Sequence, residues 1–191
     1  MTFEAPYQFQ SDKIENWAYM DNLFTLEECA QIIAVGNTKL QKAGVNNSED
    51  IKNLRKSQIA WLYYSDIAFA FSRVTEGVLN LNSQFFNFDL FGLAEGFQFT
   101  RYDAPTGHYG MHIDKSLNGT VRKLSLTIQL SSPEDYEGGE LALQTRRDAE
   151  IMSKELGKMV VFPSYVLHEV RPVTKGTRYS LVAWVTGKPF K

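Results

Sequence analysis

The chain has 191 residues and a formal net charge of −2, and 43% of its residues are hydrophobic and 13% aromatic. This composition is that of a folded globule, and the lack of a dense Lys/Arg run argues against a nucleic-acid partner. No apolar stretch reaches the roughly 20 residues that cross a bilayer, and no signal peptide is visible. We therefore expect a cytoplasmic protein that does not bind membranes, with one domain over residues 1–191.

A first helix is predicted over residues 26–40. Thr25-Leu-Glu-Glu28 has the pattern of a capping box, in which the threonine and glutamate side chains satisfy free backbone amides at the helix start. Cys29, the single cysteine, falls within this helix and is expected to be a small buried hydrophobe, in keeping with a reducing compartment. The apolar stripe of this helix would consist of Leu26, Cys29, Ile32, Ile33, Gly36 and Leu40.

The next segments are predicted to be a loop, a strand and a second helix. Residues 44–53 are polar and are expected to form an exposed loop, which with the region around Arg55 would act as a lid or face the substrate. A short strand is expected over 58–64. Asp66 is then the expected N-cap of a helix that runs to about Leu81.

From residue 86 onward the chain reads as a series of short strands. Segments rich in β-branched and aromatic residues alternate with Gly, Pro, Asn and Asp clusters. The expected strands are 95–103, 108–114, 122–131, 140–144, 158–163, 166–171 and 177–186. Helical support over about 15–85, followed by a strand core over about 86–187, predicts an α+β fold in which helices buttress an antiparallel sandwich or barrel.

One of these strands is predicted to turn a polar face inward. In Lys123-Leu-Ser-Leu-Thr-Ile-Gln-Leu130 the leucines and Ile128 alternate strictly with Ser125, Thr127 and Gln129. Because neighbouring residues of a strand point to opposite faces, the polar side chains share one face. An inward polar face indicates an interior that holds a polar ligand.

His112-Ile113-Asp114 and His168 are the candidate metal ligands. Residues i and i+2 of an extended segment point to the same side, so His112 and Asp114 can bind one ion if 108–114 is extended or ends a strand. Two imidazoles and one carboxylate hold a non-haem ferrous ion on one face and leave other positions open for reaction. Taken alone, an H-x-D triplet is a weak signal and a lone histidine is more often structural. The order of triplet, strand pair, second histidine and inward cation is the specific feature.

Arg178 is the candidate carboxylate-binding residue. It follows His168 by ten residues, across an expected turn at Lys175-Gly176. If the two segments pair as a hairpin, its guanidinium can lie deeper than the metal in the same cavity and bind a carboxylate, with Ser180 as a second donor. The ordinary alternative for such a residue is a surface salt bridge.

Tyr102, Tyr109 and His108 also lie near the triplet in the sequence. Tyr102 and Tyr109 are either core aromatics or cavity residues whose phenol orients a polar ligand. His108 stands four residues before His112, but Pro105, Gly107 and Gly110 argue against the helix that a zinc pair would need. We expect His108 to be a loop residue near the pocket mouth.

Taken together, these motifs resemble the Fe(II)- and 2-oxoglutarate-dependent dioxygenases, specifically the prolyl 4-hydroxylase-like branch that includes PKHD-type hydroxylases. The resemblance covers roughly residues 15–187. The matching segments are Asp21–Glu28, Arg101-Tyr102 through Gly107 and Tyr109 to Asp114, Arg122–Leu130, Tyr136–Leu141, Val161–Ser164, His168–Pro172 and Gly176–Ser180.

The resemblance implies a double-stranded β-helix, or jelly roll, and a set of residue roles. His112, Asp114 and His168 would bind Fe(II) as the catalytic centre. The co-substrate 2-oxoglutarate would place its far carboxylate on Arg178, assisted by Ser180, Tyr102 and Gln129. Tyr109, Arg55 and Trp184 are the candidate substrate residues. O2 would be consumed, succinate and CO2 released, and ascorbate is a candidate reductant.

The resemblance also narrows the substrate. Nucleic-acid demethylases carry a second arginine where Trp184 stands, which argues against DNA or RNA repair. We expect a prolyl hydroxylase that acts on a peptide or protein. The alternatives are a hydroxylase of a free amino acid or other small molecule, and a jelly-roll module that keeps the metal triad without turnover. The presence of Arg178 disfavours the last, and the oligomeric state stays open.

Overall fold

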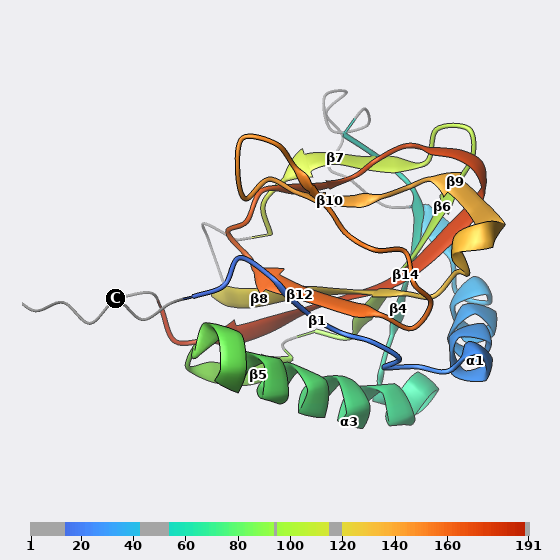
Figure 1. Ribbon diagram of the computed structural model, residues 1–191. Coiled ribbons are helices and arrows are strands. Elements are labelled where there is room, and N and C mark those ends of the chain that lie inside the picture. Colours follow the sequence, from blue (N-terminus) through green and yellow to red (C-terminus); the bar gives the residue numbers. More distant parts are fainter. Residues whose placement is uncertain (1–13, 43–53, 94, 115–119, 190–191) are drawn as a thin grey trace, which may run out of the picture.

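The structure is a computed structural model that describes residues 14–42, 54–93, 95–114 and 120–189. Within them, two antiparallel sheets lie face to face, and two helices cover the outer side of the larger sheet (Figure 1). The helices are α1 (Leu26–Asn37) and α3 (Tyr64–Leu81), followed by the π-helical turn η1 (Asn82–Phe86), while a 3-10 turn, η2 (Pro133–Asp135), lies between strands. The predicted α+β class is therefore confirmed.

One face of the larger sheet packs against the helices in the apolar core, and its other face borders the space between the two sheets. Its hydrogen-bonded order is β1-β12-β8-β14-β6-β4-β2, with β5 and β9 each paired to β14. These strands are β1 (Ala18–Met20), β2 (Gln41–Lys42), β4 (Gln58–Leu62), β5 (Leu90–Leu93), β6 (Phe97–Asp103), β8 (Arg122–Gln129), β9 (Tyr136–Gly138), β12 (Met159–Pro163) and β14 (Val173–Gly187).

The smaller sheet has the order β11-β10-β13-β7-β3 and forms the opposite wall. Its strands are β3 (Arg55–Lys56), β7 (His108–His112), β10 (Leu141–Leu143), β11 (Glu150–Ile151) and β13 (His168–Val170). All the predicted strands are found, with ends displaced by at most two residues except at the start of β14, which lies four residues before its predicted position. Residues 44–53, predicted to be a loop and a lid, lie outside the described residues.

Helix α1 starts as predicted but ends earlier. The backbone N–H of Thr25 donates to Glu28 and the N–H of Glu28 donates to the Thr25 hydroxyl, which is the predicted capping box. The helix ends at Asn37, so Leu40 lies beyond it, and Leu26 is 62% exposed because it projects from the first turn. The predicted stripe is thus wrong at both ends. Its buried members are Cys29, Ile32 and Gly36.

Helix α3 begins before its predicted start. Its first residue is Tyr64, so the predicted strand over 58–64 ends at Leu62 and Asp66 is the third helical residue. The prediction of Asp66 as N-cap is wrong, although the carboxylate still accepts the backbone N–H of Tyr63 at 2.9 Å. The helix ends at Leu81, as predicted.

The two faces of β8 have opposite character. Leu124, Leu126 and Ile128 are fully buried in the core shared with the helices. Ser125, Thr127 and Gln129 point between the sheets, where Ser125 and Thr127 line a cavity and Gln129 binds Arg178. The predicted inward polar face is therefore confirmed.

Strand β14 departs from the prediction. It starts at Val173 and continues through Lys175-Gly176, where Gly176 has a φ of +71° and pairs with Tyr136 of β9. The expected turn there is wrong, and so is the hairpin between the His168 and Arg178 segments. Strand β13 pairs with β7 and β10, so His168 and Arg178 belong to different sheets.

No helix among the described residues has both the length and the hydropathy needed to cross a membrane.

Candidate active site

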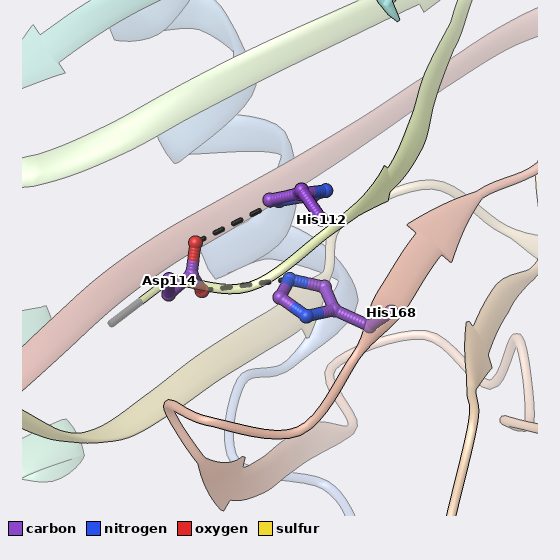
Figure 2. Close-up of side chains that lie close together, drawn as sticks. All are labelled: His112, Asp114 and His168. Carbon is purple, nitrogen blue, oxygen red and sulfur yellow. Dashed lines mark ion pairs between the residues drawn. The ribbon is translucent and has the colours of Figure 1, made fainter. Parts of the chain in front are cut away.

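Three side chains converge where the smaller sheet faces the larger one. His112 ends β7, Asp114 follows two residues later, and His168 begins β13 directly opposite His112. Their ligand atoms all lie within 4.8 Å of one another. The Asp114 carboxylate lies between the rings, 3.6 Å from His112 Nε2 and 3.4 Å from His168 Nε2 (Figure 2). The three residues thus have the positions that one shared metal ion requires.

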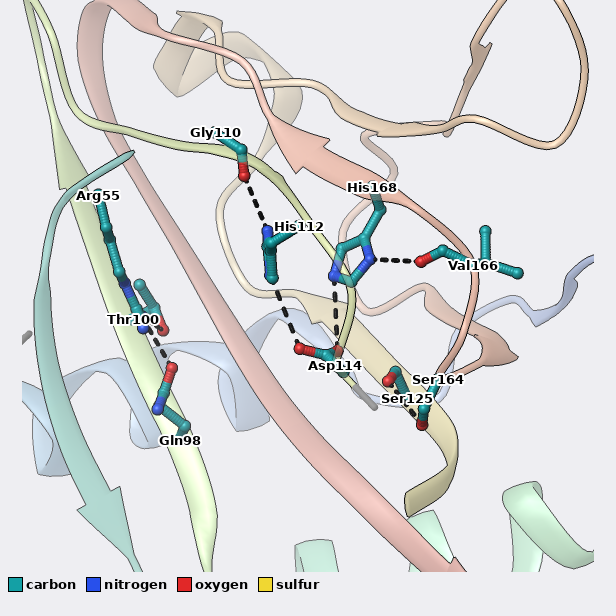
Figure 3. Close-up of polar contacts among 10 residues, drawn as sticks. All are labelled: Arg55, Gln98, Thr100, Gly110, His112, Asp114, Ser125, Ser164, Val166 and His168. Atoms are coloured by element: carbon teal, nitrogen blue, oxygen red, sulfur yellow. Dashed lines mark hydrogen bonds and ion pairs between the residues drawn. The ribbon is translucent and has the colours of Figure 1, made fainter. Parts of the chain in front are cut away.

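Hydrogen bonds behind the triad fix the direction of each ligand (Figure 3). His112 Nδ1 lies 2.8 Å from the carbonyl oxygen of Gly110, and His168 Nδ1 lies 2.9 Å from that of Val166. Because a carbonyl only accepts, both Nδ1 atoms carry the proton and both Nε2 lone pairs face Asp114. The backbone N–H of Asp114 donates to the carbonyl of Ser164 at 3.0 Å, which holds the carboxylate segment against β12.

The protonation state of His112 also favours metal binding. Burial, together with the neighbouring His168, lowers the pKa of His112 to about 4. Its ring stacks on that of Tyr109, with centroids 3.6 Å apart. The imidazole is therefore neutral near pH 7, which is the form that binds a metal.

Arg178 lies in the interior, on the face of β14 that looks toward the smaller sheet. It is fully buried, and its Nη2 donates to Gln129 Oε1 at 3.0 Å while Nη1 donates to Ser180 Oγ at 3.4 Å. The ring of Tyr102, its cross-strand neighbour, lies 5.4 Å away. Among the described residues no carboxylate pairs with Arg178, so the surface salt bridge is excluded there. Its Nε has no hydrogen-bond partner in the same part of the chain.

Tyr136 completes this end of the interior and was missed as a functional residue. Its hydroxyl is buried without a hydrogen-bond partner in the described residues. Burial raises the pKa of Tyr136, and the positive charge of nearby Arg178 opposes that rise. A Cβ added to Gly139, whose φ is +66°, would lie 3.1 Å from Arg178 Cδ and 3.2 Å from Tyr136 Cε2. The glycine therefore leaves the room that both side chains occupy.

A buried cation without a counter-charge is costly, and so is an unpaired donor. The guanidinium of Arg178, its free Nε and the free hydroxyl of Tyr136 belong to side chains that lie together, since both flank the Cβ position of Gly139. This group of donors fits a carboxylate. In the sequence, the only signal for Tyr136 was its place beside the glycine pair of Tyr136-Glu-Gly-Gly139.

The remaining predicted site residues lie in the wall of the metal cavity. Arg55, Tyr102, Tyr109 and Trp184 line it together with the triad. The cavity lining does not include Gln129, Ser180 or Arg178. Arg178 is the cross-strand neighbour of Tyr102, and Ser180 pairs with Gln129, which lies on the same face of β8 as Thr127. Trp184 is buried, and its indole N–H has no hydrogen-bond partner among the described residues.

His108 is in a strand and not in a loop, contrary to the prediction. It begins β7 opposite Lys56, and its Nδ1 lies 2.7 Å from the carbonyl oxygen of Thr106. Strand pairing with β3 extends β7 back to this residue. The group of possible metal ligands found in the described residues does not include it.

Comparisons with known proteins agree with this geometry. Residues 97–186 match the family model of the 2OG-Fe(II) oxygenase superfamily. A PKHD-type hydroxylase of Gloeothece citriformis is 43% identical over 90 residues, which are 46% of this chain and 40% of that relative. This chain thus spans less than half the length of that relative.

Two solved structures share the fold. A prolyl-4-hydroxylase of Pseudomonas putida aligns over 91% of this chain and 94% of its own, with a TM-score of 0.71 and 21% identity. A Trichoplax adhaerens prolyl hydroxylase, solved in complex with a hypoxia inducible factor oxygen degradation domain peptide fragment, covers 90% of this chain and 84% of its own, with a TM-score of 0.74 and 17% identity. The predicted double-stranded β-helix is confirmed. Residues 97–186, which include the triad and Arg178, thus match the 2OG-Fe(II) oxygenase superfamily, PKHD-type hydroxylases are among the homologues of the chain, and Fe(II) and 2-oxoglutarate are typical of this family.

Proposed function

We propose that this chain is an Fe(II)- and 2-oxoglutarate-dependent dioxygenase that hydroxylates a prolyl residue in a peptide or protein. The observation that carries the proposal is the joint presence of two sites in one interior. His112, Asp114 and His168 form a metal triad, and fully buried Arg178 has no counter-charge among the described residues. A metal-binding module without turnover needs the first site but not the second.

The triad fits Fe(II). Two neutral imidazoles and one carboxylate on one side of the ion are the ligand set of non-haem ferrous oxygenases, and they leave open positions for co-substrate and O2. When bound, Fe(II) and 2-oxoglutarate supply the oxidising chemistry, in which O2 is consumed, succinate and CO2 are released and a C–H bond is hydroxylated.

The second site fits the far carboxylate of 2-oxoglutarate. Arg178 provides the positive charge, while Ser180 and Gln129 hold its guanidinium in place. The free hydroxyl of Tyr136 and the free Nε of Arg178 offer hydrogen bonds that nothing in the described chain accepts. A charge-assisted, bidentate contact of this kind is among the stronger polar interactions in proteins.

The rest of the cavity wall is suited to keeping water out. The ring of Phe162 lies edge-on against His168, with centroids 4.7 Å apart, and Leu141, Val170 and Val182 line the same cavity. An apolar wall around a charged centre strengthens its electrostatic interactions and limits side reactions.

The substrate class is supported by the likeness to proteins named as prolyl hydroxylases, one of them solved in complex with a peptide fragment. Tyr109, Arg55 and Trp184 are the residues of this chain that we propose to face the substrate, since they line the cavity beside the triad.

The proposal is tested by a succinate assay. Protein loaded with Fe(II) and supplied with 2-oxoglutarate, O2 and ascorbate should form succinate, and a proline-containing peptide should stimulate it more than free proline does. Failure to form succinate with iron bound would overturn the dioxygenase assignment. Stimulation by free proline alone would replace the peptide substrate by a small molecule.

A further inference from the structure

Arg55 is a cation in the wall of the metal cavity whose hydrogen-bond partners are all neutral. Its Nε donates to Ser57 Oγ at 2.8 Å, and its Nη2 donates to Gln98 Oε1 at 2.8 Å and to Thr100 Oγ1 at 3.5 Å. Figure 3 shows the side chain reaching from β3 toward Gln98 and Thr100 on β6. Within the described ranges, Nη1 of Arg55 makes no hydrogen bond and no carboxylate pairs with the guanidinium. Neutral partners therefore hold the guanidinium in place, but no negative charge in these ranges balances it.

The contacts of Arg55 also tie it to the metal ligands. It pairs with Tyr109 across β3 and β7, and its guanidinium carbon lies 4.6 Å from the centre of the Tyr109 ring. The same ring stacks on His112. The Tyr109 ring thus lies between the guanidinium of Arg55 and the metal ligand His112, and the attraction between cation and ring helps to hold the guanidinium beside the site.

Neighbouring arginines differ from Arg55 because they already have a carboxylate. Arg122 pairs with Glu95 at 2.7 Å, and Arg101 pairs with Asp103 at 2.9 Å. In the proposed active complex, the charges of Asp114 and of the chelating end of 2-oxoglutarate balance those of Fe(II), and the far carboxylate balances Arg178. Within the described part of the chain, the positive charge of Arg55 then has no counter-charge.

We propose that Arg55 binds a carboxylate of the substrate, so that the substrate carries an acidic group close to the C–H bond that is hydroxylated. This inference rests on the proposed function and narrows its substrate class. The indole N–H of Trp184, buried and unpaired in the described chain, lines the same cavity and offers a further donor to an acceptor-rich substrate. The carboxylate belongs either to a free α-carboxyl group or to an Asp or Glu side chain of a peptide.

Binding to the inactive Zn(II) and 2-oxoglutarate complex tests the inference without turnover. The experiment has two arms, and each compares an acid with its amide. The first arm compares N-acetyl-L-proline with N-acetyl-L-prolinamide and tests a free α-carboxyl group. The second compares acetyl-Pro-Glu-amide with acetyl-Pro-Gln-amide and tests an acidic side chain. Titration calorimetry should show that the acid binds about tenfold more tightly than its amide in one arm, the effect of one charge-assisted hydrogen bond. The arm that responds identifies the source of the carboxylate.

Three variants assign the preference to its residue. In Arg55→Gln the acid and the amide should bind equally, whereas Arg55→Lys should keep part of the preference because it keeps the charge. Arg101→Gln is the matched control, since it removes a charge that Asp103 already neutralises, and it should keep the full preference. Equal binding of acid and amide in both arms, no binding of any probe, or a preference that survives in Arg55→Gln would overturn the inference.

The two proposals fail in distinguishable ways. Succinate formation without a second substrate depends on the triad and Arg178 but not on Arg55. If it occurs while the acid preference is absent, only the role of Arg55 is wrong. If it does not occur, the dioxygenase assignment itself is wrong.

Discussion

The two faces of the larger sheet use the same strands for different purposes. On the outer face, Phe97, Phe99, Leu126 and Leu181 are fully buried in the apolar core shared with α1 and α3. On the inner face of these strands lie Thr100, Ser125, Gln129, Arg178 and Ser180, all buried and all polar. Burial of apolar groups stabilises the folded state, whereas burial of polar groups costs free energy. The outer face therefore stabilises the fold that holds the polar side chains of the inner face in place. Substitutions on the two faces should therefore have separable effects.

The largest effect is expected from removing a metal ligand. His112→Ala or Asp114→Ala should lower turnover by about a thousandfold or more, because several kcal/mol of transition-state stabilisation depend on the bound ion. The thermal midpoint of the metal-free protein should change little, since neither residue is part of the apolar core. Metal analysis and calorimetry check both parts. A variant that binds iron as the parent does, or keeps its turnover, would contradict the assignment.

The opposite result is expected on the outer face. Phe99 is fully buried, and the position of a Cβ at Gly36 would be 2.5 Å from its ring, so helix α1 rests directly on it. Phe99→Ala should cost about 3–5 kcal/mol of unfolding free energy, the usual result of a large cavity. Succinate formation per folded molecule should be unchanged, as measured under conditions in which the variant is folded. Loss of turnover without loss of stability would show that the two faces are not separable.

An intermediate effect is expected at Arg178. Arg178→Ala should raise the 2-oxoglutarate concentration needed for half-maximal succinate formation by about a hundredfold, since it removes a charge-assisted bidentate contact. Iron binding should persist, because the triad lies on other strands. Arg178→Lys should recover part of the affinity. An unchanged 2-oxoglutarate requirement would remove Arg178 from the proposed site.

The smallest effect is expected at Cys29, on the outer side. Burial raises the pKa of its thiol to about 11, with the charge of Glu28 adding to the shift, so the reactive thiolate is scarce at neutral pH. Iodoacetamide should label the native protein slowly and the denatured protein readily, as mass spectrometry would show. Rapid labelling of the native thiol would mean that α1 does not cover the sheet as described.

The sequence predicted those features that depend on neighbouring residues. The capping box at Thr25 needs only four residues, and the two-residue period placed His112 with Asp114 and separated the two faces of β8. Arg178 and Ser180 share a face for the same reason. These are local rules, and the structure obeys them.

The errors that affect the site concern long-range pairing. Whether His168 and Arg178 pair as a hairpin depends on which strand each segment finds, and β13 pairs with β7 while β14 pairs with β6 and β8. Tyr136 was missed because its place beside Arg178 arises from the pairing of β9 with β14, 40 residues along the chain, as the pairing of Tyr136 with Gly176 shows. Strand register across a sheet is set by the whole core and not by one segment.

The most direct test of the central claim, that the triad and Arg178 serve one ligand from opposite sheets, is an anaerobic titration of the Fe(II)-loaded protein with 2-oxoglutarate. We expect a metal-to-ligand absorption band that saturates in the parent protein, is absent in His112→Ala and needs far more 2-oxoglutarate in Arg178→Ala. No band in the iron-loaded parent protein, or a band whose 2-oxoglutarate dependence is the same in Arg178→Ala, would contradict the account.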